Sequence, residues 1–440
     1  MKINSIQIFN FKQTEQKYKA KPCNTTFGNK INSVKNSELV SLFETLAKIP
    51  SPPLKEQKLA TWIMEFCKTN KLNAKFDNYK NIKINIPPTD KTKKSILFSA
   101  HMDVVGDDSP INIVFENEFI KTDGKRTLGA DDKSGVAVAL MLAKEINNGN
   151  LKHGGLEMLL TRDEELGMSG ILNAEFKDFN SKYVLVLDEA EFGKFDNSGA
   201  GFTTVTLSLT TPYGGHSGMD IRDKKRLNAA KMISELISLI PQGVYWKGNN
   251  NSVTSINVGT IIAGDIQNTA AKIVENKIVS NDYLNFFMQN SVTNVINTKA
   301  MATLSIRSSS EIKENELKQT LINIVENFNQ KYKDLLSVNI IFEELIPIFE
   351  ESEDKTLQKF YIDACKELNI SPKISSFPAG AESHIYCKNK NKNGETFIPA
   401  LLGVADIFNM HSPLEKMNFV SLKKGFELVK EIFLKFNASN

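Results

Sequence analysis

The sequence predicts an α/β protein into which a smaller α+β domain is inserted. Three apolar runs, at residues 95–100, 156–161 and 183–187, have the length and composition of strands buried on both faces. The segment 133–146, KSGVAVALMLAKEI, lies between the first two runs and has the composition and apolar stripe of a helix. A strand, a helix and two more buried strands in succession favour a sheet covered by helices. The chain has 440 residues, which is enough for two domains.

The composition indicates a globular chain without an obligatory charged partner. Hydrophobic residues make up 41% of the chain and charged residues 24%, well away from the disordered range. The 54 basic and 51 acidic residues leave a formal net charge of +3, which is too even to indicate nucleic acid or an anionic membrane as a partner. No apolar stretch approaches the roughly 18 residues that a membrane-spanning helix needs.

The cysteines indicate a reducing compartment. Cys23, Cys67, Cys365 and Cys387 are widely spaced and form no CxxC pair, which argues against a disulfide framework and against a thiolate zinc site. The N-terminus also lacks the apolar core and the cleavage site of a secretion signal. We therefore expect a cytoplasmic protein.

Residues 1–37 are predicted to form a disordered basic tail. They carry seven lysines and one glutamate, and their scattered aromatic residues show no period. Order is expected from residue 38, because Ser37 suits a helix N-cap and the apolar residues that follow have helical spacing. This helix should end at IPSPP, residues 49–53, where prolines interrupt it. A second helix is expected at 55–69.

The middle of the chain, residues 201–347, predicts a domain of its own. Its segment 202–210 alternates apolar and polar residues, as a strand with one solvated face does. The expected order is strand, helix, strand, strand, helix, strand, and the segments are 202–210, 225–240, 251–262, 300–308, 311–333 and 337–345. This order fits a ferredoxin-like α+β domain. The first domain is therefore divided into 38–200 and 348–440, with a further helix at 355–368.

Each of the three core strands runs into polar residues that can bind a metal. The first is followed by His101 and Asp103, the second by the acids of TRDEELG and the third by Asp188. Ligand sites in open α/β sheets lie beyond the carboxyl ends of the strands, so these side chains should meet. Neutral imidazole and ionised carboxylate are both zinc ligands.

The acid triplet Asp163–Glu165 needs a positive partner. Adjacent carboxylates at the edge of a core repel one another and raise each other's pKa unless a cation neutralises them. Arg162 is the only basic residue beside them in sequence, and one arginine is too little. Taken singly, an HxD in a loop, an acid pair or a DD before a helix is common without a metal. Together, at the ends of buried strands, they predict a metal site.

Six motifs occur in a fixed order along the chain. They are HMD (101–103), GADDKSG (129–135), DEELG (163–167), LDEAE (187–191), GGHSG (214–218) and the HxxxE of His411–Glu415. In type, order and spacing they resemble the motifs of the M20 family of metallopeptidases, in particular its peptidase T-like aminopeptidases. The likeness runs from about residue 38 to the C-terminus. It implies a zinc-exopeptidase-like α/β/α catalytic domain, with the inserted domain as a lid and dimerisation domain.

The resemblance implies two zinc ions per subunit, for which Mn²⁺ or Co²⁺ could substitute. The metal ligands, carried over by position, are His101 and Asp188 for one ion, Glu165 and His411 for the other, and Asp131 as the bridge. Glu189 is the alternative to Asp188, and a cis peptide is expected between Asp131 and Asp132. Three ligand carboxylates and a metal-bound hydroxide carry four negative charges, which two divalent cations would neutralise.

The resemblance also implies a mechanism. A metal-bound hydroxide would attack the scissile carbonyl, and Glu164 would be the general base that takes the proton of the water and delivers it to the leaving amine. Asp103 would orient His101 from behind the metal. His216, in the GGHSG motif, would reach the active site of the partner subunit in a homodimer and stabilise the oxyanion. As a residue beside glycines, it could equally be a turn histidine.

Four residues are expected near the substrate. Asn294 and Arg307 lie thirteen residues apart, as in the family's NVIP…R stretch, and an arginine fork suits a carboxylate. A solvated strand position is the alternative for Arg307. Gly380 and Glu382 belong to the substrate loop PAGAESHIY, where Glu382 replaces the family's usual Asp. We expect the neighbouring His384 to be a loop residue, and a substrate contact is the alternative.

Two further features depart from the family's pattern. Residues 265–293 exceed what a minimal lid needs, and this insert could alter substrate access or dimer contacts. The LDEAEFG segment lacks the DGG of close peptidase T relatives.

The resemblance implies an exopeptidase for short peptides, most directly an aminopeptidase acting on di- and tripeptides. A dipeptidase, a carboxypeptidase or an N-acyl-amino-acid amidohydrolase would use the same site. A catalytically silent homologue that binds peptides is the alternative of a different class. Neither nucleic acid nor a membrane is expected as a partner, because the folded part has no basic motif and no spanning segment.

Overall fold

The structure is a computed structural model that describes residues 32–264 and 292–439. The predicted tail falls mainly on residues 1–31 and the predicted insert mainly on 265–291, so both lie for the most part outside the described residues. Residues 32–35, which the tail prediction included, form a helical turn.

An eight-stranded mixed sheet forms the centre of the main domain, the part of the chain on either side of the inserted segment. The strand order is β1-β2-β6-β3-β7-β17-β8-β16. The strands are β1 (Asn73–Phe76), β2 (Ile82–Ile86), β3 (Ile96–His101), β6 (Leu156–Thr161), β7 (Tyr183–Glu189), β8 (Lys194–Gly199), β16 (Lys373–Phe377) and β17 (Ile398–Gly403). β3 is parallel to both β6 and β7, and β17 is parallel to β7, so their carboxyl ends share one edge of the sheet. The three predicted core strands are confirmed as β3, β6 and β7.

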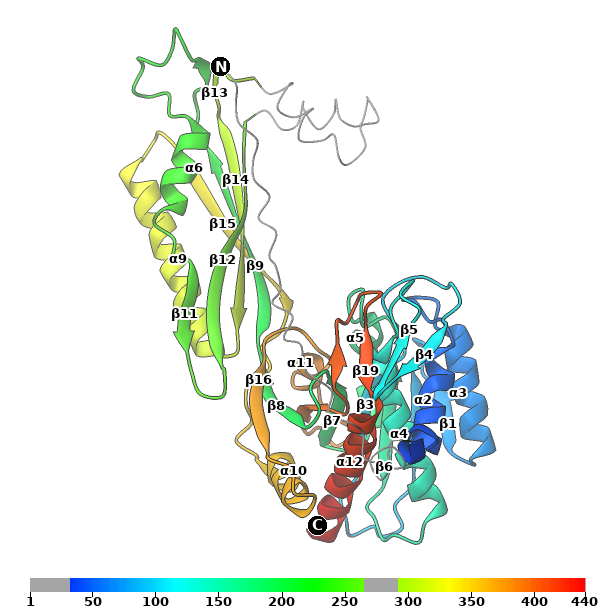
Figure 1. Cartoon of the computed structure of the whole chain (residues 1–440). Coiled ribbons are helices and arrows are strands. Elements are labelled where there is room, and N and C mark those ends of the chain that lie inside the picture. The colour runs from blue at the N-terminus through cyan, green and yellow to red at the C-terminus, as the bar shows by residue number, and fades with distance from the viewer. Residues whose placement is uncertain (1–31, 265–291, 440) are drawn as a thin grey trace.

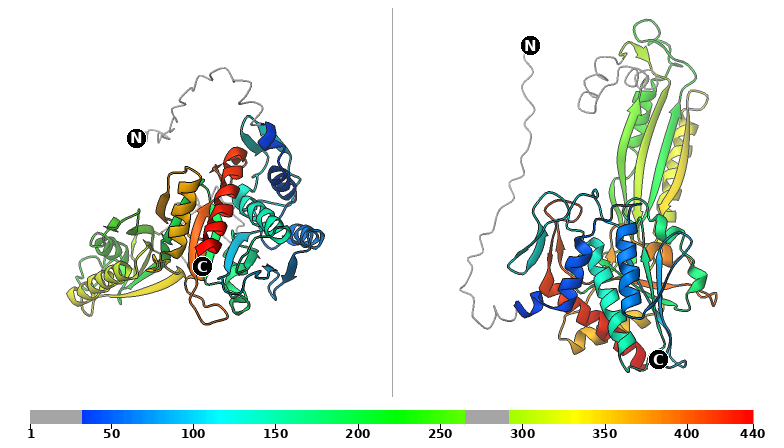
Figure 2. Two further views of the ribbon diagram at one scale, coloured as in Figure 1. Left: turned by 90° about the horizontal axis from the view of Figure 1, so that it is seen from below. Right: turned by 90° about the vertical axis from the view of Figure 1, so that its right-hand side faces the viewer.

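Helices cover both faces of this sheet, which gives the α/β/α layering. The long helices are α2 (Glu38–Ala47), α3 (Gln57–Thr69), α4 (Ala130–Asn148), α10 (Thr356–Glu367) and α12 (Phe419–Ser439). They share the larger core with strand residues such as Phe98 and Leu185. Alternate strand residues, such as Leu97 and Val186, face a second core with the short helices α5 (Ser169–Leu172), η1 (Phe176–Asp178) and α11 (Ser383–Tyr386). Figure 2 shows α10, α12 and α4 side by side.

The predicted helices of the main domain are present with shifted ends. The side chain of Ser37 accepts a hydrogen bond from the Val40 N–H at 3.4 Å and caps α2, as predicted. α4 begins at Ala130, three residues before the predicted start, because its hydrogen bonding extends back across Asp131 and Asp132 although their backbone angles are not helical. Among the described residues, no helix is long and apolar enough to span a membrane.

A four-stranded sheet that we did not predict ties together two distant segments of the main domain. Its order is β18-β19-β5-β4, with β4 (Ile113–Glu116), β5 (Phe119–Thr122), β18 (Ile407–Phe408) and β19 (Lys416–Asn418). β19 pairs with β5, so the segment that carries His411 is held beside the chain that leads into α4. The strands are too short for a sequence pattern to reveal them.

The inserted domain is an antiparallel sheet with two helices on one face. The sheet order is β11-β12-β14-β9-β15, with β9 (Gly201–Thr210), β11 (Gly243–Lys247), β12 (Val253–Ala263), β14 (Lys299–Ser308) and β15 (Ser337–Ile346). The helices α6 (Ala229–Ile237) and α9 (Glu311–Lys331) pack on it. The predicted ferredoxin-like order is confirmed, with β11 as an additional edge strand. α6 is shorter than predicted, because Asn228 caps its start and Pro241 follows its end.

Two strands carry the chain from the main domain into the inserted domain and back. β8 continues almost directly into β9, and the return segment pairs with it through Gly199 and Phe349. A two-stranded sheet of β10 (Gly215–His216) and β13 (Val295–Ile296) completes the inserted domain. Figure 1 shows β13 at the end of this domain that lies farthest from the main domain.

Candidate metal centre and active site

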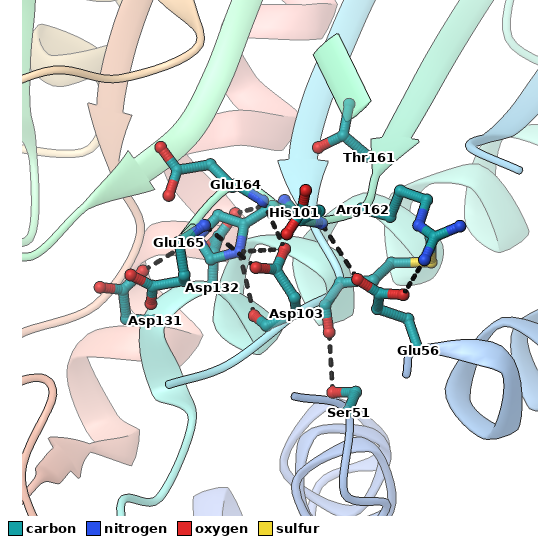
Figure 3. Close-up of polar contacts among 12 residues, drawn as sticks. Ser51, Glu56, His101, Asp103, Asp131, Asp132, Thr161, Arg162, Glu164 and Glu165 are labelled. Atoms are coloured by element: carbon teal, nitrogen blue, oxygen red, sulfur yellow. Dashed lines mark hydrogen bonds and ion pairs between the residues drawn. The ribbon is translucent and has the colours of Figure 1, made fainter. Parts of the chain in front are cut away.

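Five side chains from distant parts of the chain converge at the carboxyl edge of the main sheet. The Nε2 atom of His101, at the end of β3, lies 3.1 Å from Asp131 Oδ1 and 3.7 Å from Asp188 Oδ1 at the end of β7. The Nε2 atom of His411, in the loop between β18 and β19, lies 3.1 Å from both Asp131 Oδ2 and Glu165 Oε2. Asp131 therefore faces a histidine on each side. Figure 3 shows His101, Asp131 and Glu165 pointing toward one another.

The donor atoms fit divalent cations. His101, Asp131 and Glu165 form one set of ligand atoms within 4.8 Å of one another, and His101, Asp132 and Asp188 form a second. Glu165 Oε1 is buried without a hydrogen-bond partner, as expected of an atom that faces a cation. Imidazole nitrogens and carboxylate oxygens are the ligand types that zinc, manganese and cobalt accept.

The second set includes Asp132, to which we had assigned no metal. Its carboxylate is buried and accepts hydrogen bonds from the His101 N–H at 3.3 Å and the Gly135 N–H at 2.9 Å. Because both carboxylate oxygens already accept hydrogen bonds, we interpret Asp132 as a residue that holds the backbone of His101 and not as a metal ligand. The peptide between Asp131 and Asp132 is cis, as the resemblance implied.

Among the described residues, no lysine or arginine forms an ion pair with Glu164, Glu165 or Asp188. Burial, with Asp131 close by, raises the pKa of Glu165 to about 7 and the pKa of Asp188 to about 8. Burial, together with the carboxylates of Asp188 and Glu382, raises the pKa of Glu164 well above its ordinary value. Such shifts mark carboxylates that would hold protons at neutral pH unless a cation takes their place.

The same carboxylates raise the pKa values of the two histidines of the site. A hydrogen bond to Asp131 raises the pKa of His411 to about 9. Burial alone would lower the pKa of His101, but Asp188, Asp103 and Asp131 raise it well above its ordinary value. Divalent cations would remove both protons, because a ligating imidazole must be neutral.

Asp103 holds two parts of the site at once. Its carbonyl oxygen lies 3.0 Å from His101 Nδ1, and its carboxylate lies 3.4 Å from the same atom. The carboxylate also accepts the backbone N–H of Glu164 at 2.9 Å and of Glu165 at 3.0 Å. Asp103 therefore contacts both the His101 imidazole and the turn that carries the two glutamates.

The neighbouring residue of that turn, Asp163, is held by a carboxylate that we did not single out. Glu56 accepts the N–H of Asp163 at 3.1 Å and pairs with Arg162 at 3.0 Å. Figure 3 shows this pair on the side of the turn away from Asp131. Arg162 is thus engaged with Glu56 and does not neutralise the acids of the site.

Asp188 and Glu189, the two alternative ligands at the end of β7, have different partners. Asp188 lies 3.7 Å from His101 Nε2, whereas Glu189 is paired with Lys194 at 3.1 Å. A carboxylate that already has an ammonium partner is a poor metal ligand.

Arg307 and Gly380 lie where the inserted domain meets the main domain. The guanidinium of Arg307 stacks on Phe202 at 4.0 Å, and its Nη1 is buried without a hydrogen-bond partner. A Cβ atom on Gly380 would lie 2.5 Å from Ile346 Cδ1, so a larger residue there would require the end of the Ile346 side chain to move. Because a guanidinium nitrogen can only donate hydrogen bonds, the unpartnered Nη1 of Arg307 is suited to an anionic ligand.

Glu382 and His384 are both buried. The Glu382 carboxylate is 1% exposed and accepts a hydrogen bond from Ser99 Oγ at 2.8 Å, so its contact with substrate stays a prediction. The expectation that His384 is a loop residue is wrong. It lies in α11, and its ring nitrogens are 2.8 Å from the Pro347 carbonyl oxygen and 3.1 Å from that of Ala379, which makes it a contact to the segment that returns from the inserted domain.

His216 and Asn294 lie together at the other end of the inserted domain. His216 in β10 pairs with Val295 in β13, and the Ser217 N–H donates to the Asn294 carbonyl at 2.9 Å. Because β13 is far from the main domain, the same chain does not bring these residues to its own metal ligands (Figure 1). Arg307 lies at the opposite end of β14 from them.

The architecture and the site define a two-domain protein with a candidate histidine–carboxylate metal centre. A model of the peptidase family M20/M25/M40 matches residues 97–435, so the chain belongs to this family. It is similar to the cytosol non-specific dipeptidase of Escherichia coli (strain K12), at 30% identity over 224 residues that cover 44% of this chain and 45% of that protein. The chain thus spans less than half the length of this relative.

Two further proteins are similar over more of the chain. Peptidase T of Listeria monocytogenes serotype 4a (strain HCC23) is 25% identical over 371 residues, which cover 78% of each chain. The crystal structure of the aminopeptidase PepT from Bacillus cereus ATCC 10987 superposes with a TM-score of 0.75 and 19% identity, covering 90% of this chain and 98% of that one. At this identity the structural match shows a shared fold.

Proposed function

We propose that this protein is a dinuclear zinc-dependent exopeptidase that hydrolyses short peptides, most directly an aminopeptidase acting on di- and tripeptides. The observation that carries the proposal is the position of Asp131 between His101 and His411, with Glu164 on the neighbouring turn. The names of the relatives support the peptide substrate, since they are a dipeptidase and peptidase T.

The chain would hold one ion through His101 and Asp188, the other through Glu165 and His411, and both through Asp131. Bound there, divalent ions polarise a carbonyl oxygen and lower the pKa of a water molecule. Mn²⁺ or Co²⁺ could replace zinc, because the ligand set contains no thiolate.

Glu164 is the general base and acid of this proposal. Asp103 fixes its backbone N–H at 2.9 Å, and its side chain is not engaged by an ion pair among the described residues. It would take a proton from the attacking water and then donate it to the amine of the leaving group. Its raised pKa suits a group that must hold a proton between these two steps.

Other residues would bind substrate and complete the site. Arg307 would bind the peptide's carboxylate through its unpartnered Nη1, at the junction of the two domains. His216 and Asn294 would come from the partner subunit of a homodimer formed through the inserted domain, because their own chain holds them far from the metal ligands (Figure 1). His216 would then donate to the oxyanion.

We further propose a cytoplasmic location. Cys67, Cys365 and Cys387 are free, and the similar dipeptidase of Escherichia coli is named as a cytosolic protein. Free thiols in the core suit a reducing compartment.

The decisive experiment is incubation with di- and tripeptides, free and N-acylated, in the presence of zinc, manganese or cobalt, with the products identified by mass. Release of the N-terminal residue from free peptides would support an aminopeptidase. Activity on dipeptides alone would support a dipeptidase, which the similarity to the Escherichia coli enzyme favours as the second candidate. Release of C-terminal residues or of acyl groups would identify a carboxypeptidase or an N-acyl-amino-acid amidohydrolase. No product with any metal would leave a silent peptide-binding homologue.

A further inference from the structure

Glu415 lies in the loop of His411, yet its side chain belongs to another part of the site. Its carboxylate is 1% exposed. Oε2 accepts the Gly129 N–H at 2.7 Å and the hydroxyl of Thr127. Oε1 accepts the Ala130 N–H at 2.9 Å and the Asp131 N–H at 3.3 Å. One carboxylate therefore collects three consecutive backbone donors.

These donors belong to the first turn of α4, where the chain needs an external partner. The first N–H groups of a helix have no acceptor within the helix, and buried donors without a partner are costly. Gly129, the N-cap of α4, has no side chain to accept them, and a Cβ there would lie 2.8 Å from Val104. Glu415, nearly three hundred residues away in sequence, accepts these N–H groups and so caps α4.

The capped turn is the one that presents Asp131. Asp131 contacts His101 Nε2 and His411 Nε2, each at 3.1 Å. His411 and Glu415 lie on one short loop, held at both ends by β18 and β19. The loop therefore binds the backbone of Asp131 through Glu415 and contacts its carboxylate through His411.

From this we infer that Glu415 is a positioning residue of the metal centre, which sets the distance between Asp131 and His411 by fixing the backbone of residues 129–131. The inference rests on the proposed metal site. It predicts that changing Glu415 weakens metal binding even though Glu415 touches no metal ligand side chain. Residues behind a metal ligand typically contribute about 10–100-fold to metal affinity.

The chain offers a matched control in Glu157, which lies at the amino end of strand β6 in the same sheet. Its carboxylate is 4% exposed and accepts the Asn180 N–H at 3.0 Å, the Ser181 N–H at 2.8 Å and the Asn180 side-chain amide at 3.1 Å. Glu157 thus has the same burial and the same kind of backbone donors as Glu415. It differs in lying at the start of β6, away from the metal ligands at the strand ends.

The test compares Glu415→Gln and Glu157→Gln in the full-length protein. An amide keeps the shape of the side chain but has one accepting oxygen, so at least one N–H donor loses its partner in each variant. Zinc affinity is measured by competition with a chromogenic chelator, and Co²⁺ absorption bands report the coordination geometry. Thermal unfolding of the metal-free proteins gives the purely structural effect.

We expect both variants to unfold at lower temperature than the wild type. Only Glu415→Gln should lose roughly 10–100-fold in zinc affinity and show altered Co²⁺ bands. Unchanged zinc affinity and Co²⁺ bands in Glu415→Gln would overturn the inference, because the effect would then be structural alone. A wild-type protein that binds no zinc or cobalt would instead refute the proposed function.

A second variant covers the case in which Glu415→Gln does not fold. Glu415→Asp keeps the charge but shortens the reach by one methylene, so it should fold and bind zinc more weakly than the wild type. Wild-type zinc affinity in Glu415→Asp would contradict a role that depends on reach. Failure of both variants to fold would also reject the inference, since Glu415 would then be required for folding itself.

Discussion

Two aspartates, one beside each end of strand β7, lie in opposite electrostatic surroundings. At the amino end, Asp354 accepts a hydrogen bond from the Tyr183 hydroxyl at 3.0 Å and pairs with Lys182 at 3.2 Å. Burial alone would raise the pKa of Asp354, but its hydrogen-bond donors lower it to about 2. At the carboxyl end, burial and the nearby Asp131 raise the pKa of Asp188 to about 8.

At the amino end an acid is paired with a lysine of the chain, whereas among the described residues no lysine or arginine pairs with the acids at the carboxyl end. Two basic residues close to the acid cluster in sequence are engaged elsewhere. Arg162 pairs with Glu56 at 3.0 Å, and the ammonium of Lys133 donates to the Ile49 carbonyl at 2.6 Å. Carboxylates that are clustered and partly buried without a counter-charge need protons or metal ions.

The largest effect is expected at the carboxyl end, from Glu164→Gln. The amide cannot accept a proton from water, so kcat should fall by roughly 10²–10⁴-fold while metal content stays unchanged. Steady-state kinetics and elemental analysis of the same preparation provide the measurement. The control is Glu395→Gln, a glutamate beside the amino end of β7, which should keep full activity. Substantial turnover by Glu164→Gln would show that another residue is the base.

His216→Ala tests whether the site at the carboxyl end of β7 is completed by a residue of a partner subunit. If it donates to the oxyanion, its loss should lower kcat by roughly 10²–10³-fold without changing the fold, which circular dichroism would check. Mixing it with Glu164→Gln should restore part of the activity, because some hybrid dimers contain one complete site. An unrecovered mixture, with subunit exchange verified, would rule out a histidine that acts between subunits.

Metal removal should make the Tm of the protein fall as the pH rises. In the metal-free protein, the raised pKa values of Glu165, about 7, and Asp188, about 8, mean that the folded chain binds protons which the unfolded chain releases. Their contribution to stability is therefore present below about pH 4 and is lost as the pH rises through about 7 to 8. The Tm of chelator-treated protein should fall over this range, and zinc should abolish the fall. Parallel Tm curves with and without zinc would contradict a metal at these carboxylates.

The smallest effect is expected at the amino end, from Asp354→Asn. The lowered pKa of Asp354 gives stability that is present above about pH 4 and is lost as the pH falls through about 2. The substitution should reduce the free energy of unfolding by about 1 kcal/mol at pH 7 and by less near pH 2. Urea unfolding at both pH values measures this, and kcat should not change. A loss of activity would mean that the two ends of β7 are coupled.

Much of the site was predictable because its residues follow recognisable local patterns. His101, the Asp163–Glu165 triplet and Asp188 each come at or just after the end of a buried apolar run, and parallel strands bring such ends to one edge. The ferredoxin-like order of the inserted domain was visible for the same reason. The short strands β4, β5, β18 and β19 carry too few residues for a pattern and were missed.

The sequence by itself determined which elements form and which ligand types stand at their ends, because hydrophobic period and motif spacing are local properties. Only the tertiary structure decided which of these groups have partners. The contact between His411 and Asp131 joins residues 280 positions apart. The hydrogen bond from the Ala130 N–H to Glu415, which caps α4, joins residues 285 positions apart. Whether a buried carboxylate meets a lysine, a backbone N–H or only other carboxylates depends on such distant contacts, and that decides its pKa and its chemistry.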